Sequence, residues 1–117
     1  MHARASFGQW GENEACSYLR TKGYDIIDRN YRCKFGEIDI VACKNSELVF
    51  VEVKSRRSYK YGTPAEAVTK VKQTKIHKTA LDFLSAAGKY YEKFRFDVVE
   101  IIVQNGNVII NHIPNSF

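Results

Sequence analysis

The chain lacks any apolar run long enough to cross a membrane, and its N-terminus lacks the hydrophobic stretch of a signal peptide. It also lacks a glycine-rich phosphate loop. No serine or cysteine is accompanied by a plausible activating base. These absences argue against a membrane protein, a P-loop nucleotide-binding protein and a hydrolase that works through a covalent intermediate.

Cysteine and histidine are scarce and scattered. The chain has three of each, with no metal-type spacing among the cysteines and no histidine paired closely with one of them. These residues are Cys16, Cys33, Cys43, His2, His77 and His112. The pattern argues against a zinc site. It predicts reduced thiols and a cytoplasmic protein.

Length and patterning predict the fold class. At 117 residues and 44% hydrophobic, the chain can bury one core, and it has no repeat, low-complexity tract or linker. We therefore expect a single domain over residues 1–117. Apolar periodicity and capping residues predict helices at residues 6–23 and 63–87. Strands are predicted at residues 24–31, 36–42, 48–54, 94–104 and 107–113. The order α-β-β-β-α-β-β predicts an α/β fold with a mixed five-stranded sheet flanked by helices.

Two of these strands carry charges that a buried strand should not have. Residues 36–42 and 48–54 are apolar, β-branched runs, yet they contain Asp39, Glu52 and Lys54. Burying a charge is costly unless the charge is paired or binds a metal ion. The two acids are therefore candidates for a functional site.

The register of the hairpin decides whether the two acids meet. If residues 45–46 form a two-residue loop, Asp39 lies across from Glu52 and Glu37 lies across from Lys54. Two carboxylates that close repel one another unless a cation lies between them. A slip of one residue would place them on opposite faces, whereas a slip of two would keep them diagonal neighbours. The alternative is that Glu52 and Lys54 form an exposed edge-strand pair, which contributes little energy.

Two further polar residues fall on the apolar sides of the predicted helices. Glu12 shares a face with apolar residues such as Leu19, and Gln73 falls on the inward stripe of the second helix. The alternatives are that Glu12 pairs structurally with an arginine or a backbone amide, and that nearby backbone satisfies Gln73. In the penultimate strand, Arg95 and Asp97 share one face, and we expect them to form a structural pair.

Positive charge is concentrated in one stretch. The net charge is +5, and residues 54–78 contain eight lysines and arginines against the single acid Glu66. The eight residues are Lys54, Arg56, Arg57, Lys60, Lys70, Lys72, Lys75 and Lys78. Such a field suits a polyanion, while the alternative is a solvated helix face. The stretch begins at the acidic strands, and this proximity favours nucleic acid.

The acids suggest a particular chemistry. Glu12, Asp39 and Glu52 offer hard oxygen ligands, which suit Mg²⁺ or Mn²⁺ better than zinc. Such an ion lowers the pKa of a bound water and neutralises charge on a phosphodiester oxygen. Lys54 could hydrogen-bond the attacking water or stabilise the charge that builds on phosphorus, and Gln73 could orient the water or a phosphate. The sequence therefore predicts hydrolysis by metal-activated water.

The motifs resemble those of a known family. Asp39, followed by Glu52-Val53-Lys54, resembles the signature of the PD-(D/E)XK nuclease superfamily, whose members share a restriction endonuclease-like fold. Over nearly the whole chain, the motifs are similar to those of the bacterial YraN family. They include Gly11-Glu12, Asn30-Tyr31-Arg32, Gly36-Glu37-Ile38-Asp39, Val49-Phe50-Val51-Glu52-Val53-Lys54-Ser55-Arg56, Glu66-Ala67-Val68, Lys72-Gln73, Arg95-Phe96-Asp97 and Asn115-Ser116-Phe117. Ser116 replaces the usual alanine and Glu14 replaces a common apolar residue.

The resemblance implies roles for individual residues. It implies that Asp39 and Glu52 bind the metal, that Lys54 is catalytic and that the Val53 carbonyl is a further ligand. Holliday-junction resolvases of the superfamily use a helix-one glutamate like Glu12, and a motif glutamine on the later helix resembles Gln73.

The resemblance also implies an activity, which fold alone does not determine. It implies a Mg²⁺-dependent or Mn²⁺-dependent endonuclease acting on branched or structured DNA. Junction-cutting relatives are generally dimers, so a homodimer is a further expectation. Two alternatives stay open: a non-catalytic nucleic-acid-binding module of the same fold, and an adaptor whose lysine-rich helix meets an acidic protein.

Overall fold

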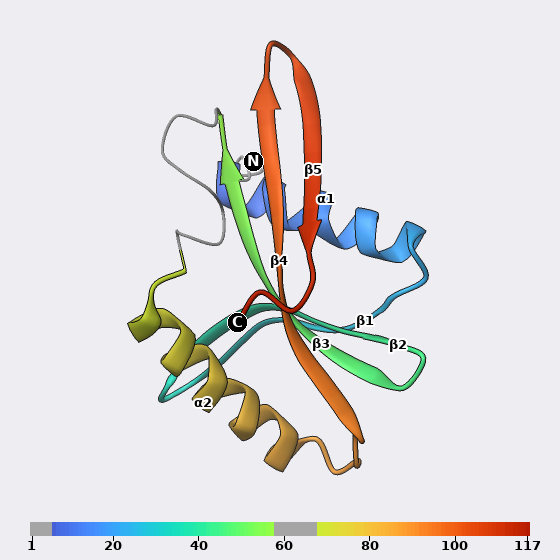
Figure 1. Cartoon of the computed structure of the whole chain (residues 1–117), viewed down its shortest axis with the longest axis vertical. Helices are drawn as coiled ribbons and strands as arrows, with labels where there is room; N and C mark the ends of the chain where they lie inside the picture. Colours follow the sequence, from blue (N-terminus) through green and yellow to red (C-terminus); the bar gives the residue numbers. More distant parts are fainter. Residues whose placement is uncertain (1–5, 58–67) are drawn as a thin grey trace, which may run out of the picture.

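The computed structural model of the protein describes residues 6–57 and 68–117. In this part of the chain, two helices and five strands follow one another in the predicted order (Figure 1). They are α1 (Phe7–Thr21), β1 (Asp25–Cys33), β2 (Gly36–Lys44), β3 (Glu47–Arg56), α2 (Lys70–Ala86), β4 (Lys93–Gln104) and β5 (Asn107–Ile113). No helix in the described part of the chain is long and apolar enough to cross a membrane.

The five strands form one mixed sheet in the order β1-β2-β3-β4-β5. Each neighbouring pair is antiparallel except β3 and β4, which are parallel. Parallel strands cannot be joined by a tight turn, and α2 lies in the crossover between these two strands. The predicted mixed sheet flanked by helices is therefore confirmed.

The two helices cover different faces of the sheet, as Figure 1 shows. The apolar side of α1 packs on one face through Ala15, Cys16 and Leu19. The apolar side of α2 packs on the other face through Ile76, Ala80 and Phe83. Alternate residues of the central strands supply the two cores, because successive strand side chains point to opposite faces. Strands β2 and β3 therefore lie between the two helices.

The start of α1 agrees with its capping signal, while the start of α2 does not. Ser6 is the N-cap of α1, and its Oγ accepts a hydrogen bond from the Gln9 N–H at 3.0 Å. The predicted start of the second helix at residues 63–66 lies outside the described residues. The helix begins at Lys70, with Thr69 as its N-cap. Its predicted extension through residues 68–69 is wrong, because Thr69 has an extended backbone and caps the helix through its side chain, while Val68 lies buried ahead of the first turn.

A buried ionic network braces the face of the sheet under α1. The fully buried Asp97 accepts hydrogen bonds from Arg95 Nε at 3.0 Å and lies 2.6 Å from His112 Nε2. Arg95 also reaches Glu47 Oε1 at 2.6 Å. Burial raises the pKa of Asp97, but the hydrogen bonds from His112 and Arg95 outweigh it, so the pKa is lowered overall. The predicted structural pair of Arg95 and Asp97 is confirmed.

Candidate active site

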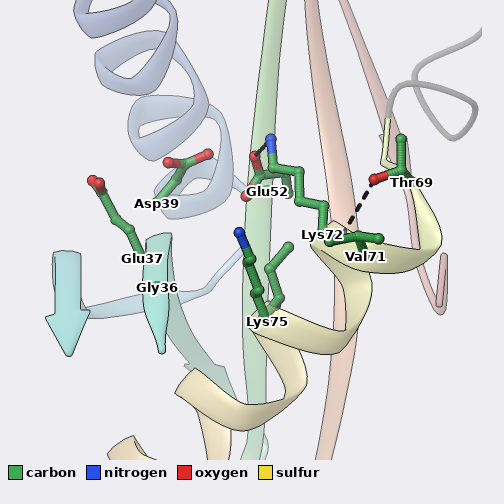
Figure 2. Close-up of a pocket in the computed structure, with 9 residues that line it drawn as sticks. Gly36, Glu37, Asp39, Glu52, Thr69, Val71, Lys72 and Lys75 are labelled. Atoms are coloured by element: carbon green, nitrogen blue, oxygen red, sulfur yellow. Dashed lines mark hydrogen bonds and ion pairs between the residues drawn. The ribbon is translucent and has the colours of Figure 1, made fainter. Parts of the chain in front are cut away.

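A hollow of about 470 Å³ opens between strands β2 and β3 and the first turns of α2 (Figure 2). Its floor comes from the two acidic strands, and its opposite wall comes from the helix. The polar side chains that line it are Glu37, Asp39, Glu52, Thr69, Lys72 and Lys75. An acidic wall thus faces a basic one across a space large enough for a phosphate group and its waters.

The hairpin register brings Asp39 and Glu52 to this hollow. The ladder between β2 and β3 runs from Lys44 opposite Glu47 to Ile40 opposite Val51. Asn45 and Ser46 occupy the turn, both with positive φ, as the tight hairpin requires. The predicted register is therefore confirmed as far as the pair of Ile40 and Val51. The ladder ends one residue before Asp39 and Glu52, so these two acids are not a ladder pair as predicted, although both line the hollow.

Asp39 is held by the backbone of the neighbouring strand. Its Oδ2 accepts a hydrogen bond from the Val53 N–H at 2.8 Å. Burial raises the pKa of Asp39 to about 7, and the nearby carboxylates of Glu52 and Glu12 add to the increase. The Val53 N–H and Lys72 act in the opposite direction without cancelling it. Asp39 is thus a carboxyl group that a nearby cation would convert to its ionised form.

Two lysines face Glu52, which is only 7% exposed. Lys72 Nζ lies 2.7 Å from Glu52 Oε1, and Lys54 Nζ lies 3.7 Å from the same oxygen. Burial and the neighbouring Lys72 lower the pKa of Lys54. Burial also lowers the pKa of Lys72, but its contact with Glu52 more than offsets this, and the pKa is raised. The predicted proximity of Glu52 and Lys54 is therefore observed, although only Glu52 lines the hollow.

Glu12 lies outside the lining of this hollow. It belongs to α1, and its Oε1 lies 4.0 Å from Arg29. It lines a separate polar depression together with Asn30 and Arg32. Glu12 is still close enough to Asp39 to raise the pKa of that carboxyl group. The contact with Arg29 agrees with the predicted structural pairing with an arginine, and the role of Glu12 as a metal ligand stays a prediction.

Gln73 and Glu37 are also placed differently from the expected site. The Gln73 amide donates a hydrogen bond to the Val68 carbonyl at 2.9 Å, so nearby backbone satisfies it. Glu37 was expected opposite Lys54, but it pairs with Arg32 Nε at 3.1 Å. The pairing of β1 with β2 places Arg32 directly beside Glu37, which explains this difference.

The residues of the predicted basic surface differ in their surroundings. Arg56 is only 16% exposed and donates from Nε to Glu100 at 2.6 Å, so it is a structural ion pair rather than part of a surface patch. Arg57 lies over the Phe7 ring at 4.3 Å. Lys60 lies outside the described residues. The remaining lysines belong to α2, and they are Lys70, Lys72, Lys75 and Lys78.

Glu100 is a buried acid that the sequence analysis missed. It is 1% exposed and lies opposite Lys54 in the parallel ladder between β3 and β4. An acid within the apolar run Val98-Val99-Glu100-Ile101-Ile102 is the same signal that identified Glu52. Its partner Arg56 comes from the other strand, so the pair becomes visible only once the parallel register is known.

The donor set suits a hard divalent ion. Within residues 6–57 and 68–117, no group of three or more His, Cys, Asp and Glu side chains is placed to hold a metal ion. Mg²⁺ commonly binds through one or two carboxylates and completes its coordination with waters and substrate phosphates. Asp39 and Glu52 meet that requirement. The raised pKa of Asp39 reflects burial first and then repulsion from Glu52, and a cation would offset both.

The fold and the hollow define an α/β protein with two acids on a β-hairpin and lysines beside them. Residues 11–101 match the family described as uncharacterised protein family UPF0102. A UPF0102 protein of Syntrophomonas wolfei is 46% identical over 110 residues, covering 94% of this chain and 96% of that protein. UPF0102 proteins of Clostridium botulinum are also similar. One of them is 46% identical over 123 aligned residues, which cover 100% of this chain and 98% of that protein. The chain therefore belongs to the UPF0102 family, which is the YraN family that its motifs resemble.

Proposed function

We propose that this protein is a divalent-metal-dependent endonuclease that hydrolyses phosphodiester bonds in branched or structured DNA. The observation that carries the proposal is the convergence of Asp39, Glu52 and Lys72 at one open hollow. Lys54 lies beside this hollow, with its Nζ 3.7 Å from Glu52 Oε1. Elsewhere in the fold, buried charges such as Asp97 and Glu100 are enclosed by ion pairs. The acids of the hollow instead face a space that a substrate can enter.

The acidic wall would hold the metal ion. Asp39 and Glu52 would be its ligands, and the Val53 carbonyl is a third oxygen on the same strand segment. Mg²⁺ or Mn²⁺ in this position supplies charge neutralisation and a water of lowered pKa. The hydrogen bond from the Val53 N–H to Asp39 fixes the orientation of that carboxylate on the neighbouring strand. The site is thus partly preorganised by the sheet itself.

The lysines would act on the phosphate. Lys54 lies on the same strand as Glu52 and would donate to the attacking water or to the phosphoryl oxygens as charge develops there. Lys72 and Lys75 line the opposite wall of the hollow. They would hold the phosphate between the first turns of α2 and the acidic strands. Gln73 is bonded to the Val68 carbonyl, so its role would be to hold this helix start in place.

The exposed lysines of α2 would bind the flanking phosphates. Lys70, Lys75 and Lys78 are exposed along the same helix, and Lys75 also lines the hollow. Phosphate contacts by such residues supply sequence-independent affinity for DNA. Cutting both strands of a branched DNA would require two such sites, which favours a homodimer.

A non-catalytic nucleic-acid-binding module is the second candidate. The observation that favours it is the ion pair between Lys72 and Glu52, which neutralises the acid from within the chain. In that case the hollow would bind a DNA phosphate through its lysines, and the acids would serve to hold those lysines in place. This candidate predicts salt-sensitive DNA binding that is unchanged by Asp39→Asn.

A cleavage assay separates these candidates. Wild type, Asp39→Asn and Glu37→Gln should be incubated with labelled duplex, flapped and four-way-junction DNA, with Mg²⁺, Mn²⁺ or EDTA. Glu37 is the matched control because it lines the same hollow but pairs with Arg32. We expect metal-dependent cleavage by wild type and Glu37→Gln, and none by Asp39→Asn. Absence of cleavage of every substrate by wild type would contradict the proposal.

A further inference from the structure

The shortest ionic contact in the hollow is made by a lysine from α2. Lys72 Nζ lies 2.7 Å from Glu52 Oε1, whereas Lys54 Nζ lies 3.7 Å from that atom. Figure 2 shows the Lys72 side chain reaching from the helix across the hollow to Glu52. The motif lysine is therefore the more distant of the two cations that face this carboxylate.

The contact neutralises a charge that would otherwise be costly. Glu52 is 7% exposed and lies beside Asp39, whose pKa it helps to raise. A buried carboxylate next to a second acid needs a positive partner. Lys72 supplies one ammonium group directly to the carboxylate oxygen that a divalent ion would also use.

The two side chains of this contact differ in conformational freedom. Glu52 lies on β3, a central strand that is hydrogen-bonded on both sides. The Lys72 side chain is 39% exposed and extends from the first turn of α2. Its flexible four-carbon stem allows the ammonium group to move into water once a divalent ion takes over the neutralisation of Glu52. Lys72 is thus the member of the pair that can be exchanged.

We propose that Lys72 is an exchangeable internal counter-ion of Glu52 that competes with a divalent cation for this carboxylate. The inference rests on the proposed function, in which Asp39 and Glu52 hold the ion. It makes Lys72 a residue that sets the affinity of the site for metal, in addition to any contact with DNA. The protein would then bind a divalent ion more weakly than its two acids alone would allow.

The test is a calorimetric titration of MnCl₂ into wild type, Lys72→Met and Lys75→Met without DNA. Lys75 is the matched control because it lines the same hollow and its removal changes the charge equally. We expect the dissociation constant of Lys72→Met to be about tenfold lower than that of Lys75→Met, since it loses the direct competitor. Equal constants for the two variants would overturn the inference.

Two further measurements keep the test decisive. Lys72→Arg retains the charge and can hold a carboxylate through two hydrogen bonds, so its Mn²⁺ affinity should fall below that of wild type. A higher affinity in Lys72→Arg would contradict competition. Without added metal, Lys72→Met should unfold at a lower temperature than Lys75→Met, and saturating Mn²⁺ should reduce this difference. A difference that Mn²⁺ leaves unchanged would indicate a purely structural ion pair.

The titration is independent of the cleavage assay. Competition between Lys72 and Mn²⁺ without cleavage of any DNA would contradict the nuclease proposal and leave this inference standing. Cleavage by wild type together with equal Mn²⁺ affinities in the two methionine variants would support the nuclease proposal and overturn the competition between Lys72 and the metal ion. The absence of Mn²⁺ binding in every protein would overturn the competition, while the cleavage assay would still decide the enzymatic activity.

Discussion

Asp39 of strand β2 accepts a hydrogen bond at 2.8 Å from the backbone N–H of Val53, the residue that follows Glu52 on strand β3. The hydrogen bond replaces the regular ladder, whose last pair is Ile40 opposite Val51. It fixes one acid on the strand that carries the other. The carboxylates are held together by the hairpin, and the chain must accommodate their repulsion.

The burial of Asp39, together with this repulsion, predicts how stability depends on pH. The pKa of Asp39 is raised from 3.8 to about 7, by burial first and then by Glu52 and Glu12, with Lys72 acting against them. The folded protein therefore keeps a proton that the unfolded chain loses near pH 4. Stability should decrease as the pH rises from about 4 to 7, by about 4 kcal/mol from this group, since one pKa unit corresponds to about 1.4 kcal/mol. Urea denaturation across this pH range measures the effect.

Asp39→Asn should remove this pH dependence. We expect the variant to be more stable than wild type at pH 8, because no charge then needs to be held beside Glu52. Glu37→Gln is the control, since Glu37 pairs with Arg32 at the surface, and it should keep the wild-type slope. If Asp39→Asn and wild type lost stability equally between pH 4 and 7, the raised pKa of Asp39 would be wrong.

The close approach of α1 to β3 predicts a severe effect at Gly11. A Cβ at this position would lie 1.7 Å from Ser55 Oγ and 2.9 Å from Ser55 Cβ. Gly11→Ala should push the helix away from the strand and destabilise the protein by about 3 kcal/mol. Chemical denaturation measures the change.

Gly8→Ala is the matched control for this substitution. Gly8 lies in the same helix, and a Cβ there has only Ser6 Oγ nearby, at 4.0 Å. Alanine should stabilise the helix slightly, by about 0.5 kcal/mol. Ser55→Gly should partly rescue Gly11→Ala, because it removes both atoms that the new methyl group meets. No difference between the two glycine variants would contradict the packing of α1 against β3.

Lys54 should affect the chemical step more than metal binding. It is the more distant of the two lysines that face Glu52, and the proposal assigns it to the phosphate or the attacking water. Lys54→Met should lower the single-turnover cleavage rate by about 100-fold, a loss typical of a missing electrostatic contact in the transition state. The Mn²⁺ affinity should not weaken. Loss of Mn²⁺ binding together with cleavage would count against this division of roles.

The exposed lysines of α2 should govern the salt dependence of DNA binding. The double variant Lys75→Ala, Lys78→Ala removes two exposed charges beside the hollow. The slope of log affinity against log salt should decrease in magnitude by about 2, since each lost phosphate contact contributes about 0.9. Lys89→Ala, Lys93→Ala is the control, because these exposed lysines lie beyond the C-terminal end of α2. Equal slopes for the two double variants would exclude this helix as the DNA-binding surface.

The part of the site that depends on local sequence could be predicted. The turn at residues 45–46 allows one hairpin register, and the period of two along a strand then places Asp39 and Glu52 on the same face. The pair of Arg95 and Asp97 followed from the same period. These predictions needed only residues that are close in the chain or opposite in a tight hairpin.

The part that depends on tertiary placement could not be predicted. Helical periodicity showed that Glu12 lies on the inward side of α1, but not that α1 covers the other face of the sheet, where Arg29 is its partner. The contact between Lys72 and Glu52 requires α2 to cross over the sheet with its first turn above β3. The pairing of Glu100 with Arg56 requires the parallel register of β3 and β4. Propensity and periodicity contain none of this information.

The most direct test of the account is a calorimetric titration of Mn²⁺ into wild type, Asp39→Asn and Glu37→Gln. The central claim is that Asp39 and Glu52 together hold a divalent cation. We predict one binding site in wild type and Glu37→Gln, and no measurable binding in Asp39→Asn. Equal Mn²⁺ binding by wild type and Asp39→Asn, or no binding by wild type, would contradict the claim.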